Sequence, residues 1–162
     1  VEDAKRVEAL AGAERIADGK LVRLSPSPMG SQSNGSAAIL GMERGDGGLL
    51  GHCGKDTGLL IGAVSYVAIR EDEAEFGYWI GVPYWGCGYC TEAVAALIEF
   101  GFNTLGLTKQ VARHLPENTA SARVIIKNGL HYIGDVTGTL RGHNRVLKHY
   151  ELSAQEYFAK RP

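Results

Sequence analysis

The sequence lacks several features that would place it in a class at once. Its 17 basic and 18 acidic side chains leave a formal net charge of −1, so it has no excess of positive charge of the kind that binds nucleic acid. No apolar run approaches the roughly 20 residues that span a bilayer, and the N-terminus lacks the basic-then-apolar order of a signal peptide. We therefore expect no nucleic-acid partner, no membrane span and a cytoplasmic location.

Cysteine is also scarce. Three cysteines, an odd number, do not form the disulfide framework of a small secreted domain. With 162 residues, of which 44% are hydrophobic, the chain can bury a core without such cross-links. We predict a single domain over residues 1–162.

The most informative stretch covers residues 73–103, EAEFGYWIGVPYWGCGYCTEAVAALIEFGFN. Aromatic and β-branched residues from Ala74 to Val82 predict a strand, and Pro83 interrupts it, so the strand should end near Val82. From Thr91 the apolar residues recur at three- and four-residue spacing, which predicts a helix that stops near Gly106. The order is therefore strand, glycine-rich turn, helix.

The turn between these elements contains Gly86 and Gly88. Without side chains at these positions, backbone N–H groups can close around an anion. The turn precedes a helix N-terminus, where unpaired N–H groups and the helix dipole favour negative charge. This pattern indicates a phosphate site, although glycines at such a position can also serve the turn alone.

Two segments, GYWIGVPYWGCGYCTEA and PENTASARVIIKNGL, together resemble the acetyl-CoA-binding core of the GNAT N-acetyltransferase superfamily. The resemblance is closest to the branch similar to ribosomal-protein N-terminal acetyltransferases. That branch shows a tyrosine-tryptophan pair, a G-x-G-Y turn, a Thr-Glu-Ala helix start, and an N-x-x-S helix that ends in glycine and a hydrophobic residue. All of these occur here in order, and the resemblance is convincing from about Leu60 to Leu130.

The resemblance implies an α/β fold with a mixed, mostly antiparallel central sheet flanked by helices on both faces. It implies an enzyme that moves an acetyl group from acetyl-CoA to a primary amine by direct transfer in a ternary complex. The acceptor is either a protein N-terminal amino group or a small amine. Relatives usually begin with a strand before the first helix, whereas this sequence starts at the helix itself, so either that strand is absent or the sequence is a trimmed product. A homodimeric assembly stays open.

Family contacts with acetyl-CoA can be carried over by position. In relatives, backbone groups at the end of the central strand bond the pantetheine arm, the glycine turn binds pyrophosphate, and the asparagine of N-x-x-S positions pantetheine. One strand N–H could stabilise the developing oxyanion, a contribution of about 3 kcal/mol per donor. The corresponding residues are Ile80, Val82, Gly86, Cys87, Gly88, Tyr89, Cys90, Thr91 and Asn118.

Glu75 is the candidate catalytic base, because it falls where many relatives keep a glutamate on the central strand. It could accept the ammonium proton directly or through a water. The alternative is that Glu75 pairs with a cation on the surface of the sheet. Glu92 is a weaker candidate, since a glutamate in the first turn of a helix is expected for dipole reasons alone.

Ser121 is the second catalytic candidate, because the serine of N-x-x-S lies near the CoA sulfur in relatives. There it could protonate or stabilise a departing thiolate. Asn118 and Ser121 also have the spacing of a helix N-cap and its N3 position, so capping is the alternative role. Many GNAT enzymes place a tyrosine seven residues after the asparagine, but that position is Ile125 here. Ser121 or water must therefore act as the proton donor to the departing thiolate.

Other chemistries remain open. Cys87 and Cys90 form a C-x-x-C at a helix start, which in redox proteins lowers the thiol pKa, yet both occupy variable positions of the turn. A zinc site would need two further ligands, which only His52 and Cys53 could supply, and we expect no metal. The chain could also bind CoA as a sensor or scaffold without turnover.

The remaining segments complete the expected fold. Val1–Gly19 predicts one or two helices, and the polar run Ser25–Ser36 predicts a surface loop, which lines the acceptor side in relatives. His143 has the best functional claim among the histidines, because its turn borders the acceptor site in relatives. Four aromatic residues, Tyr78, Trp79, Tyr84 and Trp85, either line the cofactor or pack in the core. The other expected elements are the hairpin strands Leu49–Cys53 and Leu59–Ile69, the strand Lys109–Leu115, the helix Asn118–Asn128, and the strands His131–Thr139 and Arg145–Leu152.

Overall fold

The computed structural model describes the backbone of residues 38–45, 48–54, 60–140 and 142–161, and the side chains of residues 61–139 and 142–161. The helices predicted in Val1–Gly19 and the loop predicted at Ser25–Ser36 lie outside the described residues. None of the described helices is long and apolar enough to cross a membrane.

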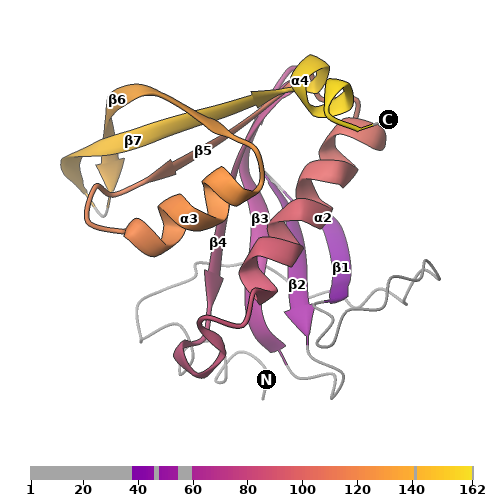
Figure 1. The fold of residues 1–162 in the computed structure, drawn as a ribbon, viewed down its shortest axis with the longest axis horizontal. Helices are drawn as coiled ribbons and strands as arrows, with labels where there is room; N and C mark the ends of the chain where they lie inside the picture. Colours follow the sequence, from indigo (N-terminus) through magenta and orange to yellow (C-terminus); the bar gives the residue numbers. More distant parts are fainter. Residues whose placement is uncertain (1–37, 46–47, 55–59, 141, 162) are drawn as a thin grey trace.

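The described strands form one seven-stranded sheet in the order β1-β2-β3-β4-β5-β7-β6 (Figure 1). Only β4 and β5 run parallel, and every other neighbouring pair is antiparallel. The predicted mixed, mostly antiparallel sheet is therefore confirmed. The strands are β1 (Ala38–Gly45), β2 (Gly48–Gly54), β3 (Leu60–Arg70), β4 (Glu73–Ile80), β5 (Lys109–His114), β6 (His131–Leu140) and β7 (His143–Ser153).

The predicted hairpin of β2 and β3 is confirmed, with His52 opposite Ala63. Sequence analysis missed β1, which pairs with β2 at the edge of the sheet. The predicted central strand was too long, because β4 ends at Ile80 and Val82–Tyr84 forms a short 3₁₀ helix, η1. Pro83 explains this, since proline fixes a φ that suits the first turn of a helix and lacks the N–H that a sheet requires.

Two long helices lie in front of the sheet in Figure 1. Helix α2 (Tyr89–Asn103) starts two residues before the predicted Thr91, and α3 (Thr119–Lys127) follows β5 as predicted. Gly129 follows α3 in the left-handed conformation expected of a helix C-terminal glycine, with φ +87°. The helices expected on the opposite face fall on residues outside those described.

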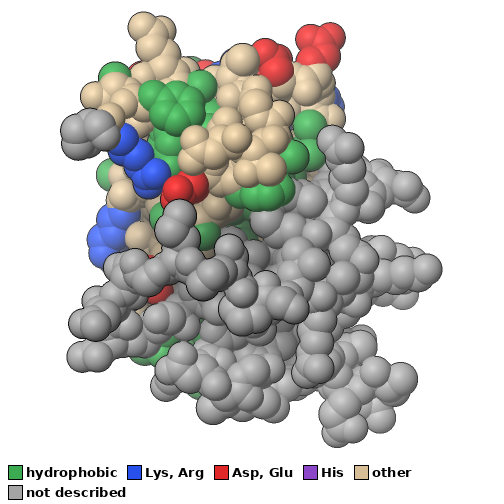
Figure 2. Space-filling model, turned by 90° about the vertical axis from the view of Figure 1, so that its right-hand side faces the viewer, with side chains coloured by type: hydrophobic (Ala, Val, Ile, Leu, Met, Phe, Trp, Pro, Cys, Tyr) green, Lys and Arg blue, Asp and Glu red, His purple; other side chains and the backbone are tan. Residues whose placement is uncertain are grey.

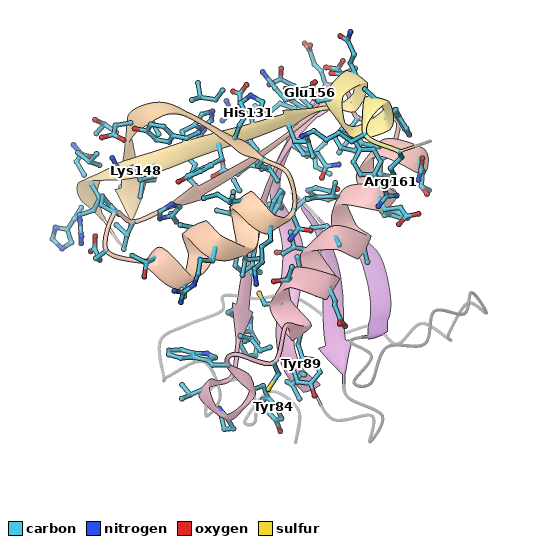
Figure 3. All side chains as sticks on the ribbon, viewed as in Figure 1. Tyr84, Tyr89, His131, Lys148, Glu156 and Arg161 are labelled. Carbon is cyan, nitrogen blue, oxygen red and sulfur yellow. The ribbon has the colours of Figure 1, made fainter. Side chains whose placement is uncertain are left out.

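Sequence analysis also missed the short helix α4 (Ala154–Ala159), although its start has a recognisable pattern. Ser153 Oγ accepts a hydrogen bond from the Glu156 N–H, and the Glu156 carboxylate accepts one from the Ser153 N–H, which is a capping box. His131 Nδ1 lies 3.5 Å from the same carboxylate (Figure 3). The S-x-x-E spacing was the signal that could have predicted this helix.

The core lies between the sheet and α2, and it has a polar centre. Gln110 of β5 is fully buried; its Nε2 donates to the Ile98 carbonyl at 2.8 Å. The Tyr66 hydroxyl lies 2.8 Å from both Gln110 Oε1 and the Leu97 carbonyl, and donates its one proton to them. These bonds connect β3, β5 and α2 with their buried polar atoms paired, so the register of α2 on the sheet is fixed.

On the described part of the face drawn in Figure 2, basic side chains are visible at the left and acidic ones at the top right and near the centre. In that described part, neither sign gathers into a broad patch. This agrees with the formal net charge of −1 of the whole sequence.

Candidate active site

The candidate site is built on a gap between β4 and β5. These strands pair only from Glu73 opposite Lys109 to Phe76 opposite Ala112. Beyond that point β4 continues to Ile80 while β5 continues to His114, and the two strands diverge (Figure 1). Among the described residues, the last part of β4 therefore has a neighbouring strand on its β3 side only.

Backbone polar groups of β4 face this gap. The Gly81 N–H donates to the Ile61 carbonyl of β3 at 2.8 Å, so backbone alternation directs the N–H groups of Tyr78 and Ile80 toward the gap. The Ile80 carbonyl accepts the Trp85 indole N–H at 3.0 Å. An extended, amide-containing chain placed in the gap would find a row of backbone partners there.

The placement of Val82 differs from the sequence-based expectation. Val82 lies in η1 rather than on the strand, and its carbonyl accepts the Trp85 N–H at 3.1 Å. The backbone row that faces the gap is therefore made by Tyr78 and Ile80. Tyr78 was assigned only to an aromatic wall or the core, and the alternation of strand residues was the signal that could have found its backbone role.

The glycine turn lies at the start of α2, at the open end of the gap. Gly86 and Gly88 have φ of +76° and +83°, the left-handed region that favours glycine. Gly88 is the N-cap of α2, and it has no side chain with which to cap the helix. The 15-residue helix thus presents its first N–H groups and its dipole to the turn. Tyr84 and Tyr89 pack edge to face beside the turn, with ring centroids 6.5 Å apart (Figure 3).

A second helix end is tied to the first turn of α2. The Asn128 amide, just after α3, donates to the Thr91 carbonyl of α2 at 3.2 Å and to the Val124 carbonyl at 2.9 Å. At the other end of α3, Asn118 Oδ1 accepts the Ser121 N–H at 3.0 Å, which makes Asn118 the N-cap. The capping role considered for Asn118 is therefore confirmed.

Ser121 meets the central strand through Tyr78. The Tyr78 hydroxyl lies 2.8 Å from Ser121 Oγ and 3.0 Å from the Ser121 carbonyl. Burial raises the pKa of Tyr78 well above its usual value and outweighs the hydrogen bond with Ser121, which lowers it, so the phenol is neutral at physiological pH. Tyr78 and Ser121 thus form a protonated pair on the helix-covered side of β4.

The C-x-x-C pair does not have the properties of a redox site. Cys87 and Cys90 are both free thiols. Burial raises the pKa of the Cys90 thiol to about 12, which is opposite to the lowered pKa that activates redox cysteines. The helix start does not compensate for the loss of water around this thiol. The thiol-disulfide alternative is therefore disfavoured.

We expect Cys90 to resist alkylation in the folded protein. At pH 8 a thiol with a pKa near 12 is almost entirely protonated, and the thiolate is the reactive form. Iodoacetamide at pH 8, followed by peptide mass mapping, should label the exposed Cys87 at least about 100-fold faster than Cys90. Addition of urea should make the two rates similar, because both thiols are then exposed, whereas equal rates already in the native state would show that Cys90 is activated.

Glu75 lies on the opposite face of β4 from Tyr78. Its Oε2 is 3.2 Å from Arg113 Nη1, and its side chain is 26% exposed. Arg113 Nε donates to His149 Nδ1 at 3.2 Å, so His149 carries its proton on Nε2, which contacts Glu151 Oε1 at 2.8 Å. The carboxylate is thus oriented by a chain of groups from β5 and β7. The cation pairing considered for Glu75 is present, and the same pairing positions it beside the gap.

Sequence analysis did not single out Arg113 or include His149 in the site. No local motif marks them, because they reach Glu75 only through the pairing of β5 with β4 and β7. His143, the histidine chosen from its turn, begins β7 and is exposed. Among the residues whose side chains are described, no group of three His, Cys, Asp or Glu residues could hold a metal ion. The side chains of His52 and Cys53 lie outside that set.

A hollow of about 310 Å³ is lined by residues of α3, of β6 and β7, and of the end of β5 with the segment that follows it. The Leu115 carbonyl can only accept, so His114 Nδ1 donates to it at 2.7 Å, and His114 Nε2 lies 3.3 Å from the Tyr150 hydroxyl. Its buried histidine is thus already paired, and we assign the hollow no part in the site. It is lined by His114, Pro116, Thr119, Ala122, Tyr132, Lys148 and Tyr150.

Comparison with known proteins identifies the family. Residues 7–131, more than half of the 162, match the family model described as an acetyltransferase (GNAT) domain. The chain belongs to the GNAT acetyltransferase family. The resemblance found in the sequence is therefore confirmed at the level of the family.

Curated GNAT relatives match over part of their length. The chain is 38% identical over 73 residues to "Uncharacterized N-acetyltransferase p20" of Bacillus licheniformis, covering 44% of this chain and 41% of that protein. It is 35% identical over 100 residues to "Uncharacterized protein YkkB" of Bacillus subtilis (strain 168), covering 60% of this chain and 56% of that protein. The chain thus spans about half the length of the curated relatives it matches.

Solved structures share the GNAT fold. A proposed ribosomal-protein-serine acetyltransferase from Vibrio cholerae superposes with a TM-score of 0.62 at 27% identity, covering 66% of this chain and 64% of that one. A point mutant of the spermidine N-acetyltransferase SpeG from Vibrio cholerae gives a TM-score of 0.65 at 18% identity, covering 72% of both chains. The second likeness shows the fold alone.

Proposed function

We propose that this protein is an N-acetyltransferase that moves an acetyl group from acetyl-CoA to a primary amine by direct transfer in a ternary complex. The observation that carries the proposal is the divergence of β4 from β5 after Phe76, which leaves backbone groups of Tyr78 and Ile80 facing a gap. That gap leads into the left-handed glycine turn at the start of α2. The two features suit the amide-rich arm and the pyrophosphate of one molecule of acetyl-CoA.

Residues on the two faces of β4 have different roles in the proposed reaction. Glu75, held by Arg113, accepts the proton of the amine nucleophile on one face. Ser121 lies on the other face, where its hydroxyl stabilises the departing thiolate. The Ile80 N–H points into the gap between them and stabilises the negative charge that develops on the acetyl oxygen. Direct transfer requires the groups on both faces of β4 at the same time, because the amine and the thioester would approach each other from opposite faces of the strand.

The acceptor is proposed only as a class. The names of structural neighbours include a proposed ribosomal-protein-serine acetyltransferase and a spermidine N-acetyltransferase, which act on different kinds of amine. Both a protein N-terminal amino group and a small amine fit the proposed chemistry. A cytoplasmic location and a homodimeric assembly stay predictions.

Calorimetric titration of the reduced protein with acetyl-CoA, CoA and adenosine diphosphate tests the proposal. We expect micromolar affinity for both CoA species and weaker binding of the diphosphate, which lacks the arm that fills the gap. Release of CoA thiol in the presence of a panel of peptides and polyamines then tests turnover. Absence of CoA binding would contradict the proposal. Binding without transfer to any acceptor would favour the sensor or scaffold instead.

The substitution Gly88→Ala should weaken binding of both CoA and adenosine diphosphate by about tenfold. An L-residue at a φ of +83° costs about 1–2 kcal/mol, so the turn shifts away from the conformation that presents its N–H groups. Gly106→Ala is the matched control, because Gly106 has a φ of +68° and lies after α2, far from the turn in sequence, with equally open space for a Cβ. Equal losses in both variants would show a general effect of stability instead of a phosphate site.

A further inference from the structure

The tyrosine that many GNAT enzymes carry on the helix after β5 is replaced here by Ile125, which is fully buried. A different phenol reaches that helix from the sheet. The Tyr78 hydroxyl of β4 lies 2.8 Å from Ser121 Oγ and 3.0 Å from the Ser121 carbonyl. The hydroxyl missing from α3 thus has a counterpart on β4 that contacts Ser121 directly.

The hydrogen bonds of this pair allow two arrangements of its two protons. A carbonyl oxygen only accepts, so in one arrangement Tyr78 donates to the Ser121 carbonyl and Ser121 Oγ–H donates to Tyr78. In the other, Tyr78 donates to Ser121 Oγ, and the serine proton is free to point into the gap. The heavy atoms stay in place, because only the two hydroxyl hydrogens rotate.

We propose that Tyr78 is a positioning residue for the leaving group, acting through Ser121. By donating to Ser121 Oγ it directs the serine proton toward the thiolate sulfur, and it strengthens the serine as a donor through cooperative hydrogen bonding. The inference rests on the proposed function, which places Ser121 beside that sulfur. It adds a residue of the central strand to the leaving-group machinery.

The bonds and charges balance without ionisation of Tyr78. As the amine nitrogen bonds to the acetyl carbon, the carbon–sulfur bond breaks and its electron pair stays on sulfur. The amine proton goes to Glu75, and the thiolate takes its proton from water as it leaves, while Ser121 and Tyr78 keep theirs. Burial raises the pKa of the phenol, so Tyr78 stays a neutral donor.

The surroundings of Tyr78 support this role. Cys90 is the other ionisable group that acts on the phenol, and burial keeps its thiol protonated, so no competing anion draws the Tyr78 proton away. The Phe76 ring is stacked beside the Tyr78 ring, with centroids 6.3 Å apart. The ring is therefore fixed by packing, and its hydroxyl lies at Ser121 before substrate binds.

A double-mutant cycle tests the inference, because a residue that acts through Ser121 loses its effect when Ser121 is gone. We expect Tyr78→Phe to lower kcat about tenfold, the size of one hydrogen bond, with the KM for acetyl-CoA changed less than twofold. In the Ser121→Ala background the same change should cost less than twofold. In Ser121→Thr, which keeps a hydroxyl, it should again cost about tenfold.

The control is Tyr157→Phe in α4, which removes a buried hydroxyl that has no hydrogen-bond partner among the described residues. Because α4 carries none of the proposed site residues, Tyr157→Phe should leave kcat unchanged. Calorimetric binding of CoA to each variant shows that it is folded.

The outcomes separate the inference from the proposed function. If Ser121→Ala lowers kcat, and Tyr78→Phe lowers kcat by a further tenfold in that background, Tyr78 does not act through Ser121. That result would overturn the inference. If Ser121→Ala leaves kcat unchanged while CoA still binds, the placement of Ser121 at the leaving sulfur is wrong and the inference fails with it. A native protein that binds no CoA would overturn the proposed function itself.

Discussion

Replacement of Glu75 by glutamine should lower kcat by about 10² to 10⁴, the usual contribution of a general base, with little change in the affinity for acetyl-CoA. Glutamine has the same shape, and its amide oxygen can still accept from Arg113 Nη1, which lies 3.2 Å from the carboxylate. The variant therefore keeps the packing and loses only the ability to take a proton. Steady-state kinetics with the best acceptor measures the effect.

Glu73→Gln is the matched control for this experiment. Glu73 lies two residues away on β4, so alternation places it on the same face, and it forms an ion pair of 2.7 Å with Lys109. Both residues lie where β4 and β5 are still paired, but Glu73 is three residues before Phe76, the last paired residue of β4, and Glu75 is one residue before it. A similar loss of kcat in both variants would indicate a general need for negative charge on this face. Unchanged turnover in Glu75→Gln would remove Glu75 from the base role.

Replacement of Gly101 by alanine should destabilise the fold by about 3–5 kcal/mol, although alanine in a helix interior is normally about 1 kcal/mol better than glycine. Gly101 is buried in α2, and a Cβ there would overlap the Tyr66 hydroxyl and the Gln110 amide. Both groups are committed to buried hydrogen bonds of 2.8 Å. Moving them leaves buried polar atoms unpaired, at about 1–3 kcal/mol each.

Urea denaturation of the wild type, Gly101→Ala, Tyr66→Phe and the double variant tests the cause of this loss of stability. Tyr66→Phe removes one of the two groups that the new methyl would meet, so it should cost less in the Gly101→Ala background than alone. Simple addition of the two losses would mean that the hydroxyl is not the obstacle. A gain in stability for Gly101→Ala would mean that helix propensity outweighs the close packing of α2 on the sheet.

The sequence was sufficient where local chemistry decides the structure. The strand-turn-helix order follows from Pro83, the two glycines of the turn and the apolar spacing of α2, and it was placed within about two residues. The N-cap at Asn118 follows from its own side chain. The strand β1 lacked such a signal except for the Gly-Asp-Gly-Gly run that starts at Gly45, which is typical of a hairpin turn.

Contacts between distant strands could not be predicted. Arg113 reaches Glu75 because β5 lies parallel to β4, and His149 reaches Arg113 because β7 returns beside β5. The face on which each strand residue lies depends on the register, and one residue of slip would exchange the two faces. For the same reason, the bond between Tyr78 and Ser121 could be found only from the structure.

The Asn128 amide, which bonds the Thr91 carbonyl and the Val124 carbonyl, has a consequence for substrates that lack the nucleotide. It joins the first turn of α2, next to the proposed pyrophosphate site, to the end of α3, the helix that carries Ser121. A nucleotide bound at the start of α2 would therefore restrict the motion of α3 through Asn128, and with it the position of Ser121. Short thioesters that lack the nucleotide would gain no such support for α3, so we expect them to react slowly even at concentrations that saturate the gap.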